Sequence, residues 1–309
     1  MQIYNNNSWK LEQIKEIWFK LERDMQKLTE DNLENIFWLE FIKTEFQLNN
    51  LRIDSLAFDV ESNSFVIIEY KRWNSYSVID QWMSYLALML NNKADFVQEL
   101  SRKKDKFIDS KTIDWSQSKI IIIADSFNRY QKESINFKDL AIDLWELKQF
   151  NDWTIVFNPI KASNTTESIK TVTKFETWEF KSVNKEIKTY TVDDHFKEWW
   201  YNYRELYEEL KEKIMSLDPR IEETPNKRYI WFKIWNKNLI DIKIRKSKLL
   251  IELLRVQPEN LIDPEKKTKN QDNAMKYYWK YVSLYYILDE NDIDYWIMLI
   301  KQILKKFFN

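Results

Sequence analysis

The chain contains no glycine, and this constrains its turns more than any other feature of the sequence. At ordinary usage of about 7%, a chain of this length would hold roughly 20 glycines. The 309 residues include none, and they include 15 tryptophans. Glycine adopts positive φ without a steric penalty, so tight turns and helix ends commonly depend on it. Either other residues close the turns of this chain, or some tryptophans stand at glycine positions.

Several tryptophans stand where backbone chemistry favours glycine. Trp153 follows Asp152 between two apolar runs, where an Asp-Gly pair would be a strong hairpin signal. Trp38 follows a helical run, at the place of a glycine C-cap. We hypothesise that the gene uses UGA for glycine and that the printed chain reads UGA as tryptophan. The alternative is a truly tryptophan-rich protein. Under either reading, the apolar surroundings of Trp115 and Trp145 predict genuine core aromatics.

Composition excludes several kinds of site. Cysteine is absent, so no disulfide, thiolate metal site or cysteine nucleophile exists. His195 is the single histidine, which excludes histidine-rich zinc sites and disfavours a Ser-His-Asp triad. The net charge of −1 means that nucleic acid would be bound through local basic patches. The longest aliphatic run, at 120–124, is far shorter than a membrane span, and the N-terminus lacks signal-peptide features. We therefore expect a cytoplasmic protein without membrane contact.

The order of apolar patterns predicts a protein of the mixed α/β (α+β) class. Residues 10–38 have apolar positions at helical spacing, and the extended runs that follow are rich in β-branched residues. A mixed sheet flanked by helices is expected in residues 1–160. After the helical region, the predicted elements are strands at 41–47, 51–59 and 64–70, a helix at 77–100, strands at 119–124 and 142–148, and a hairpin at 152–153.

A change of composition predicts a second, smaller domain. Residues 161–193 are rich in Ser, Thr, Asn, Lys and Glu and read as a polar linker. Residues 194–309 then predict a compact α+β domain. Its expected elements are a helix at 194–217 closed by Asp218-Pro219, strands at 228–234, 239–245, 248–254 and 281–288, and a terminal helix at 292–307.

Three residues of the first domain form a candidate catalytic group. Asp54 lies in one predicted strand, and Glu69 and Lys71 lie at the end of the next. Residues two apart in a strand point the same way, so all three can project from one face of paired strands. Two carboxylates suit Mg²⁺, and Mn²⁺ is the alternative; such an ion keeps several waters and binds substrate phosphates. A lysine beside it can orient or deprotonate water. The group must converge in one pocket that solvent can reach.

These residues resemble the PD-(D/E)XK nuclease superfamily, and in particular its NucS-type and RecB-type endonucleases. The resemblance rests on Arg52-Ile-Asp54, on Glu69-Tyr-Lys71 and on Gln81-x-x-x-Tyr85, and it covers about residues 10–160. It implies a restriction-endonuclease-like fold, metal ligation by Asp54 and Glu69, and a catalytic role for Lys71. Gln81 and Tyr85 would help to shape the site.

The same resemblance implies an acidic residue from the leading helix. Glu22 fits that place best, and Glu45 is its competitor. Trp73 and Trp82 fall where the relatives carry glycine. Over its whole length the chain resembles bacterial proteins that join this module to a C-terminal domain of unknown function.

The expected function is Mg²⁺-dependent cleavage of DNA, with the C-terminal domain contacting nucleic acid or protein. Weak candidates for phosphate contact are Arg52 and Arg72 beside the site and Lys243 and Arg245 on one side of a C-terminal strand. The alternative is an inactive nucleic-acid-binding or interaction module on the same fold. RNA as substrate and formation of a homodimer stay open.

Overall fold

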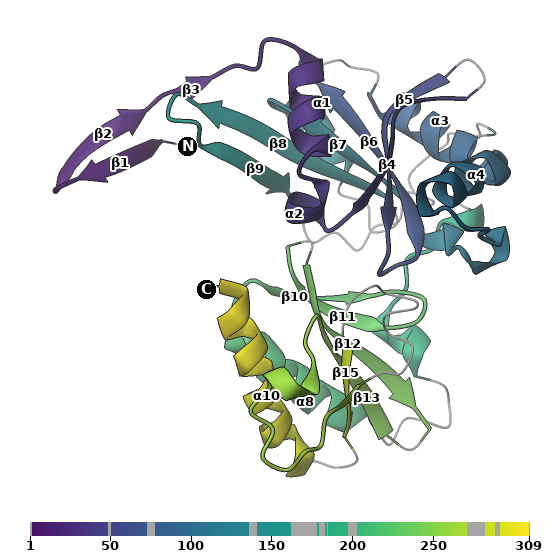
Figure 1. Ribbon diagram of the computed structural model, residues 1–309, viewed down its shortest axis with the longest axis vertical. Helices are drawn as coiled ribbons and strands as arrows, with labels where there is room; N and C mark the ends of the chain where they lie inside the picture. Colours follow the sequence, from purple (N-terminus) through teal and green to yellow (C-terminus); the bar gives the residue numbers. More distant parts are fainter. Residues whose placement is uncertain are drawn as a thin grey trace. The chain divides into compact units, whose positions relative to one another are not determined.

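The computed structural model divides into two compact units, Met1–Lys188 and Thr189–Asn309 (Figure 1). Each unit has its own sheet and its own hydrophobic core. Val183 and Ile187, within the stretch predicted as a linker, pack in the core of the first unit. The structure describes residues 2–48, 51–72, 78–135, 141–161, 178, 183, 185–196, 203–235, 237–246, 248–270, 282–287 and 291–308, without the side chains of 78–82, 134, 282–286 and 307–308.

The first unit is built on a mixed seven-stranded sheet in the order β3-β8-β7-β6-β5-β4, with β9 paired to β8. Strands β6, β7 and β8 run parallel, and their neighbours are antiparallel. The strand bounds are β3 Glu16–Ile17, β4 Glu40–Leu48, β5 Leu51–Asp59, β6 Ser64–Lys71, β7 Lys119–Ala124, β8 Ile142–Phe150 and β9 Ile155–Ile160.

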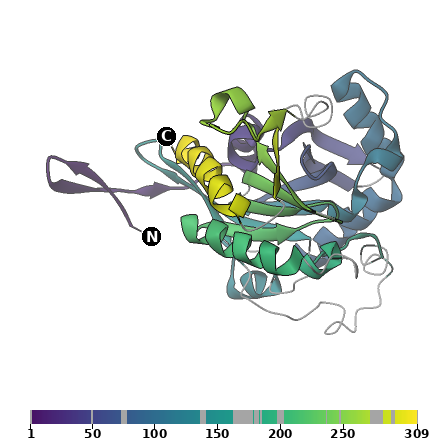
Figure 2. The same ribbon diagram turned by 90° about the horizontal axis from the view of Figure 1, so that it is seen from below.

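Helices cover both faces of this sheet, as apolar parallel strands require. Helices α1 (Glu22–Glu30) and α2 (Leu33–Phe37) pack with Val66, Ile68 and Tyr70. Helices α3 (Val78–Asn91) and α4 (Lys93–Lys104) pack with the alternate residues of the same strand. Figure 2 shows the unit from a second direction. The short elements on the α3 face are η1 Ser110–Thr112, η2 Trp115–Gln117 and α5 Arg129–Ser134.

A tight hairpin joins β5 to β6 and sets the register of the candidate site. Asp59 Oδ1 accepts the backbone N–H groups of Glu61 (2.9 Å) and Ser62 (3.2 Å), so its side chain closes the turn. The antiparallel register pairs Ser55 with Ile68. The next position along each strand therefore brings Asp54 beside Glu69.

The second unit has a six-stranded antiparallel sheet in the order β10-β11-β12-β13-β15-β14. Two amphipathic helices, α8 and α10, supply the rest of its core. No helix in the described ranges is both long and apolar enough to cross a bilayer. The bounds are η3 Val192–His195, α8 Arg204–Leu217, β10 Ile221–Pro225, β11 Ile230–Ile234, β12 Lys237–Arg245, β13 Lys248–Leu254, η5 Pro258–Asn260, β14 Lys269–Asn270, β15 Val282–Ile287 and α10 Asn291–Phe308.

The predicted α/β class is confirmed, as are most predicted strands and helices. The single helix predicted at 77–100 is two helices, α3 and α4, which are separated at Asn92, and two further boundaries are wrong. Residues 10–38 are only partly helical, because β1 (Ile3–Asn7) and β2 (Lys10–Ile14) form a hairpin before β3. The helix expected from residue 194 begins at 204 in the described part, since residues 192–195 form a 3₁₀ turn. In both stretches the apolar spacing alone does not separate a short extended or turn segment from a helix.

Four of the tryptophans that the structure describes adopt the left-handed backbone conformation that favours glycine. Their φ angles are 70° at Trp9, 60° at Trp38, 70° at Trp153 and 53° at Trp235. A bulky residue at positive φ is a conformational outlier. Trp38 caps α2, and Trp153 lies in the β8–β9 turn, as the glycine hypothesis predicts. By contrast, the rings of Trp115 and Trp145 are buried against phenylalanines, so the expectation of core aromatics is confirmed.

We predict that Trp153→Gly stabilises the printed chain. The left-handed conformation costs a residue with a Cβ about 1–2 kcal/mol, and the exposed ring of Trp153 has little packing to lose. Trp145→Gly, the matched control in the neighbouring strand, should destabilise by at least about 3 kcal/mol because it empties a core position. Urea unfolding of the two variants measures both changes. Destabilisation by Trp153→Gly, or tryptophan at position 153 in a peptide mass of the natural protein, contradicts the glycine hypothesis.

Candidate active site

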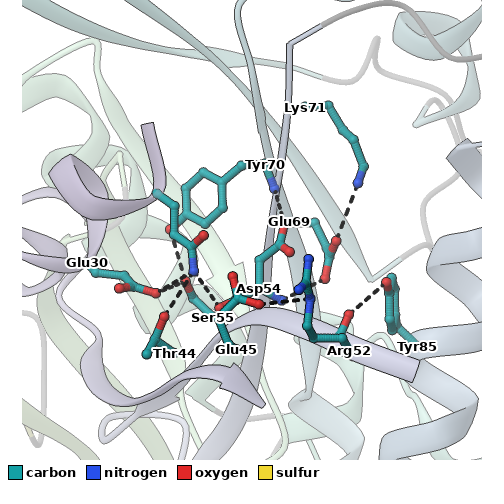
Figure 3. A network of polar contacts seen from close by, with 11 residues as sticks. Glu30, Thr44, Glu45, Arg52, Asp54, Ser55, Glu69, Tyr70, Lys71 and Tyr85 are labelled. Atoms are coloured by element: carbon teal, nitrogen blue, oxygen red, sulfur yellow. Dashed lines mark hydrogen bonds and ion pairs between the residues drawn. The ribbon is translucent and has the colours of Figure 1, made fainter. Parts of the chain in front are cut away.

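The structure brings Asp54, Glu69 and Lys71 together at one end of the β5–β6 pair (Figure 3). The backbone N–H of Asp54 donates to Glu69 Oε1 at 3.2 Å. In return, the N–H of Tyr70 donates to Asp54 Oδ2 at 3.0 Å. Lys71 Nζ lies 3.7 Å from Glu69 Oε2. The predicted convergence of the three groups is therefore present in the geometry.

These contacts replace the regular ladder between the two strands. Backbone pairing of β5 with β6 runs from Asp59 and Ser64 to Ser55 and Ile68. Beyond that point the carboxylate of Glu69 accepts the N–H of Asp54, and the carboxylate of Asp54 accepts the N–H of Tyr70. Each carboxylate is thus fixed by a main-chain donor of the opposite strand, and the local fold itself sets where both point.

Burial and proximity raise the pKa of both carboxyl groups. Burial, with the negative charge of Asp54 as the second cause, raises the pKa of Glu69 to about 8. The pKa of Asp54 is also raised by burial, against the hydrogen bond from Tyr70 and the charge of Lys71, which both lower it. At pH 7, below its pKa, the Glu69 carboxyl therefore retains its proton.

The expectation that solvent reaches all three groups is wrong for Glu69. The Glu69 side chain is buried, with 2% of it exposed, whereas 26% of the Lys71 side chain is exposed. Asp54 is half-buried. Helices on both faces of the sheet bury residues of a central strand, and strand alternation alone does not predict this burial.

A third carboxylate lies near Asp54, and it is Glu45. The β4–β5 register, which pairs Thr44 with Ser55 and Phe46 with Ile53, sets Glu45 opposite Asp54. Its charge raises the pKa of Asp54. Glu22, the favoured candidate from the sequence, instead accepts the backbone N–H of Arg72 at 2.9 Å. Of the two, Glu45 is the one that acts electrostatically on Asp54.

A polar layer behind β5, which the sequence analysis missed, holds the backbone of Asp54. Gln26 Nε2 donates to the carbonyl oxygen of Asp54 at 2.8 Å and contacts Thr44 Oγ1 (3.1 Å) and Glu30 Oε1 (3.0 Å). Ser55 Oγ donates to Glu30 at 2.5 Å. The signal was the four-residue spacing of Glu22, Gln26 and Glu30, which places three polar side chains on one face of a helix.

Of the two candidate site residues in helix α3, Gln81 and Tyr85, Tyr85 has a defined structural role. Its hydroxyl donates to the carbonyl oxygen of Arg52 at 3.1 Å and so ties α3 to the start of β5. The side chains of Gln81 and Trp82, and all of Trp73, lie outside the described residues. The expectation that Tyr85 helps to shape the site agrees with its position.

The four residues expected to contact phosphate differ in their exposure and in the partners that they already have within the protein. Arg52 is exposed and its Nε lies 2.8 Å from Glu45; Arg72 donates to the carbonyl of Lys20. In the second unit Arg245 is exposed. Lys243 was a wrong choice for phosphate contact: it pairs with buried Glu252 and lies 4.4 Å from the centre of the Tyr229 ring. With 13% of its side chain exposed, it is an internal charge.

The donor set is chemically suited to Mg²⁺ or Mn²⁺. Both prefer oxygen ligands, and Mg²⁺ is commonly held by one or two carboxylates together with waters and substrate phosphates. Asp54 and Glu69 supply two such carboxylates. No group of three or more His, Cys, Asp or Glu side chains with metal-binding geometry occurs among the described residues. Within the described part of the chain, the candidate site is therefore a two-carboxylate site.

Two sequence comparisons describe the relatives of the chain. Residues 192–302, in the second unit, match a family model described as a domain of unknown function (DUF5655). An uncharacterized protein of Haemophilus influenzae (strain ATCC 51907 / DSM 11121 / KW20 / Rd) is 40% identical over 306 residues, which is 99% of this chain and 100% of that protein.

Two solved structures align with part of the chain. A repair endonuclease from Pyrococcus abyssi matches at 17% identity over 43% of this chain and 50% of its own. The structure of an EndoMS complex with double-stranded DNA matches at 20% identity over 44% of this chain and 54% of its own. The chain thus spans about half the length of each. Both TM-scores are 0.26, so these likenesses contribute nothing to the roles of residues in the site.

We predict that the metal-free protein loses stability as pH rises toward about 8, the pKa of Glu69. A carboxyl whose pKa is raised by folding binds its proton more tightly in the folded state, so its stabilising effect is full below its ordinary pKa of about 4.3 and is lost as pH rises through the folded value. The slope from this group is at most about 1.4 kcal/mol per pH unit. Glu69→Gln should flatten it. Urea unfolding at several pH values measures the slope, and parallel profiles for the two proteins contradict the assignment.

Proposed function

Because this chain belongs to the same family as the Haemophilus influenzae protein, which it matches from end to end, we propose a function for that family: divalent-metal-dependent hydrolysis of phosphodiester bonds in DNA. The first unit would carry the chemistry, and the second would contact nucleic acid or protein. The proposed ions are Mg²⁺ and Mn²⁺.

One observation carries the proposal: two carboxylates and an ammonium group meet at the end of the β5–β6 hairpin. Asp54 and Glu69 hydrogen-bond to each other's strands, and Lys71 Nζ lies 3.7 Å from Glu69. Hydrolysis of a phosphodiester needs stabilisation of negative charge and a nearby group that handles a proton. This cluster supplies both kinds of group from neighbouring positions.

Each residue of the cluster has a separate role. Asp54 and Glu69 would hold the ion, which when bound stabilises charge on the scissile phosphate. Lys71 would orient the attacking water through its N–H donors and exchange a proton with it. Gln26 and Tyr85 would keep β5 in place through the carbonyl groups of Asp54 and Arg52. The exposed guanidinium of Arg52 is positioned to contact a flanking phosphate.

A second candidate function is favoured by the burial of Glu69. Both carboxyl groups already accept main-chain hydrogen bonds, and Lys71 lies beside Glu69, which is the state of a structural cluster. On that reading the first unit binds nucleic acid without cleaving it. The two functions differ in one measurable respect, strand scission in the presence of Mg²⁺ or Mn²⁺.

We predict that Lys71→Ala and Glu69→Gln each lower DNA cleavage by about 100-fold or more, the usual loss when a group that stabilises a transition state is removed. The substrates are single-stranded, branched and mismatched DNA with Mg²⁺ or Mn²⁺, and an RNA arm tests the sugar preference. Lys148→Ala is the matched control, because Lys148 is a strand lysine of similar exposure that pairs with Glu16 away from the cluster.

Three outcomes of this assay decide between the readings. Loss of cleavage in both variants, with circular dichroism and the control unchanged, supports the nuclease. Binding of DNA without scission in the unaltered chain favours the binding module. Unchanged cleavage in both variants refutes the assignment of the residues.

A further prediction is that cation binding releases a proton from the carboxyl pair. A metal ion requires deprotonated ligands, so it must displace the proton that Glu69, with its pKa raised to about 8, retains at pH 7. Titration calorimetry with Mn²⁺ in buffers of different ionisation enthalpy measures the number of protons released. About one proton is expected from the unaltered chain and none from Glu69→Gln; equal proton release from both would contradict ligation by Glu69.

A further inference from the structure

An isolated β-hairpin projects from the edge of the first unit. Strands β1 and β2 pair only with each other, in a two-stranded sheet, and in both views they extend away from the rest of the unit (Figures 1 and 2). A lone two-stranded hairpin is marginal in water. Both of its outer edges also present unpaired backbone groups, which other chains can bind. We call residues 3–14 the arm.

The arm and its base expose large apolar side chains. Tyr4 and Leu11 lie on one face of the arm, since Tyr4 pairs with Gln13 and Asn6 with Leu11. Leu11 is 67% exposed. The exposed apolar residues continue at the base with Ile17, Trp18 and Leu21. A run of this kind on a monomer marks an interaction surface.

The charges of β2 indicate what this surface binds. Lys10 and Glu12 precede and follow Leu11 in β2; both point to the face opposite to Leu11, and both are exposed. Their cross-strand neighbours are Asn7 and Asn5; Asn7 Nδ2 donates to Glu12 Oε2 at 3.4 Å, and no described residue forms an ion pair with Lys10 or Glu12. The arm therefore carries one charge of each sign, without an ion-pair partner among the described residues, on either side of an apolar residue. This pattern does not suit a polyanion, but it is complementary to itself in the reverse direction.

The backbone geometry sets the register of such self-pairing. Ser8 and Trp9 form a two-residue turn with both φ angles positive, 51° and 70°, as in a type I′ hairpin. Asn7 and Lys10, which flank this turn, then form backbone hydrogen bonds with each other, between β1 and β2. Hydrogen-bonded and non-hydrogen-bonded positions alternate along a strand, so the N–H and C=O groups of Leu11 point away from β1, toward the free edge of β2.

If β2 met a second β2 about a two-fold axis at Leu11, the two leucines would form a hydrogen-bonded pair. Lys10 of each copy would then lie opposite Glu12 of the other. These two Lys10–Glu12 pairs would be non-hydrogen-bonded pairs, in which opposite side chains lie closest together. We propose that a second copy of this chain docks on β2 in this register, so that two arms form a continuous four-stranded antiparallel sheet.

A charge-exchange experiment on the full chain tests the proposal. Lys10→Glu and Glu12→Lys each set like charges opposite one another twice in the dimer, and each should weaken self-association by roughly tenfold. The double variant Lys10→Glu/Glu12→Lys exchanges the two charges and should restore the affinity of the unaltered chain. Sedimentation equilibrium measures the dissociation constants. Lys27→Glu is the control, since it reverses an exposed charge on α1 outside the arm.

Every outcome bears on the proposal. Dimers that weaken in both single variants and recover in the double variant support it. A monomeric chain at all accessible concentrations, or dimers insensitive to the single changes, overturns it. Binding of duplex DNA that falls with Lys10→Glu, rises with Glu12→Lys and does not depend on self-association would assign the arm to nucleic acid instead. Unchanged thermal unfolding in all variants excludes a general effect on the fold.

Discussion

The reciprocal hydrogen bonds between Asp54 and the end of β6 are the interaction on which the candidate site depends. Asp54 donates its N–H to Glu69 and accepts the N–H of Tyr70, so the two strands are held through carboxylates where the ladder stops. Two carboxyl groups are thereby forced together, and their pKa values rise. The same contacts that hold the strand ends together thus place two carboxyl groups side by side, where a cation would displace the proton of Glu69.

The convergence of this site could be predicted from the sequence because it is a local property. Asp54, Glu69 and Lys71 lie on two strands joined by a short hairpin, so strand alternation is enough to place them on one face. The burial of Glu69 and the support of Asp54 by Gln26 could not be predicted in this way. Both depend on how helix α1 and the helices of the other face pack on the sheet, which one chain segment does not determine.

The missing glycines explain a second error. Residues 10–14, the second strand of the arm, were expected to be helical, although Ser8-Trp9 makes a turn with two positive φ angles. Read as Ser-Gly, the same pair flanked by extended residues is a recognised hairpin signal. The hairpin at Trp153 was predicted correctly because tryptophan was read there as glycine. The turn at Trp9 was missed because tryptophan was not read there as glycine. The glycine hypothesis therefore bears on fold prediction as well as on the identity of the natural residues.

The central claim is that the carboxylates of Asp54 and Glu69 form one cation site. Anomalous scattering from crystals of the protein soaked in Mn²⁺ tests it most directly, because the signal locates the ion itself. The account predicts a strong peak between these two carboxylates. Manganese bound only elsewhere, with Asp54 and Glu69 keeping their main-chain hydrogen bonds, would contradict it.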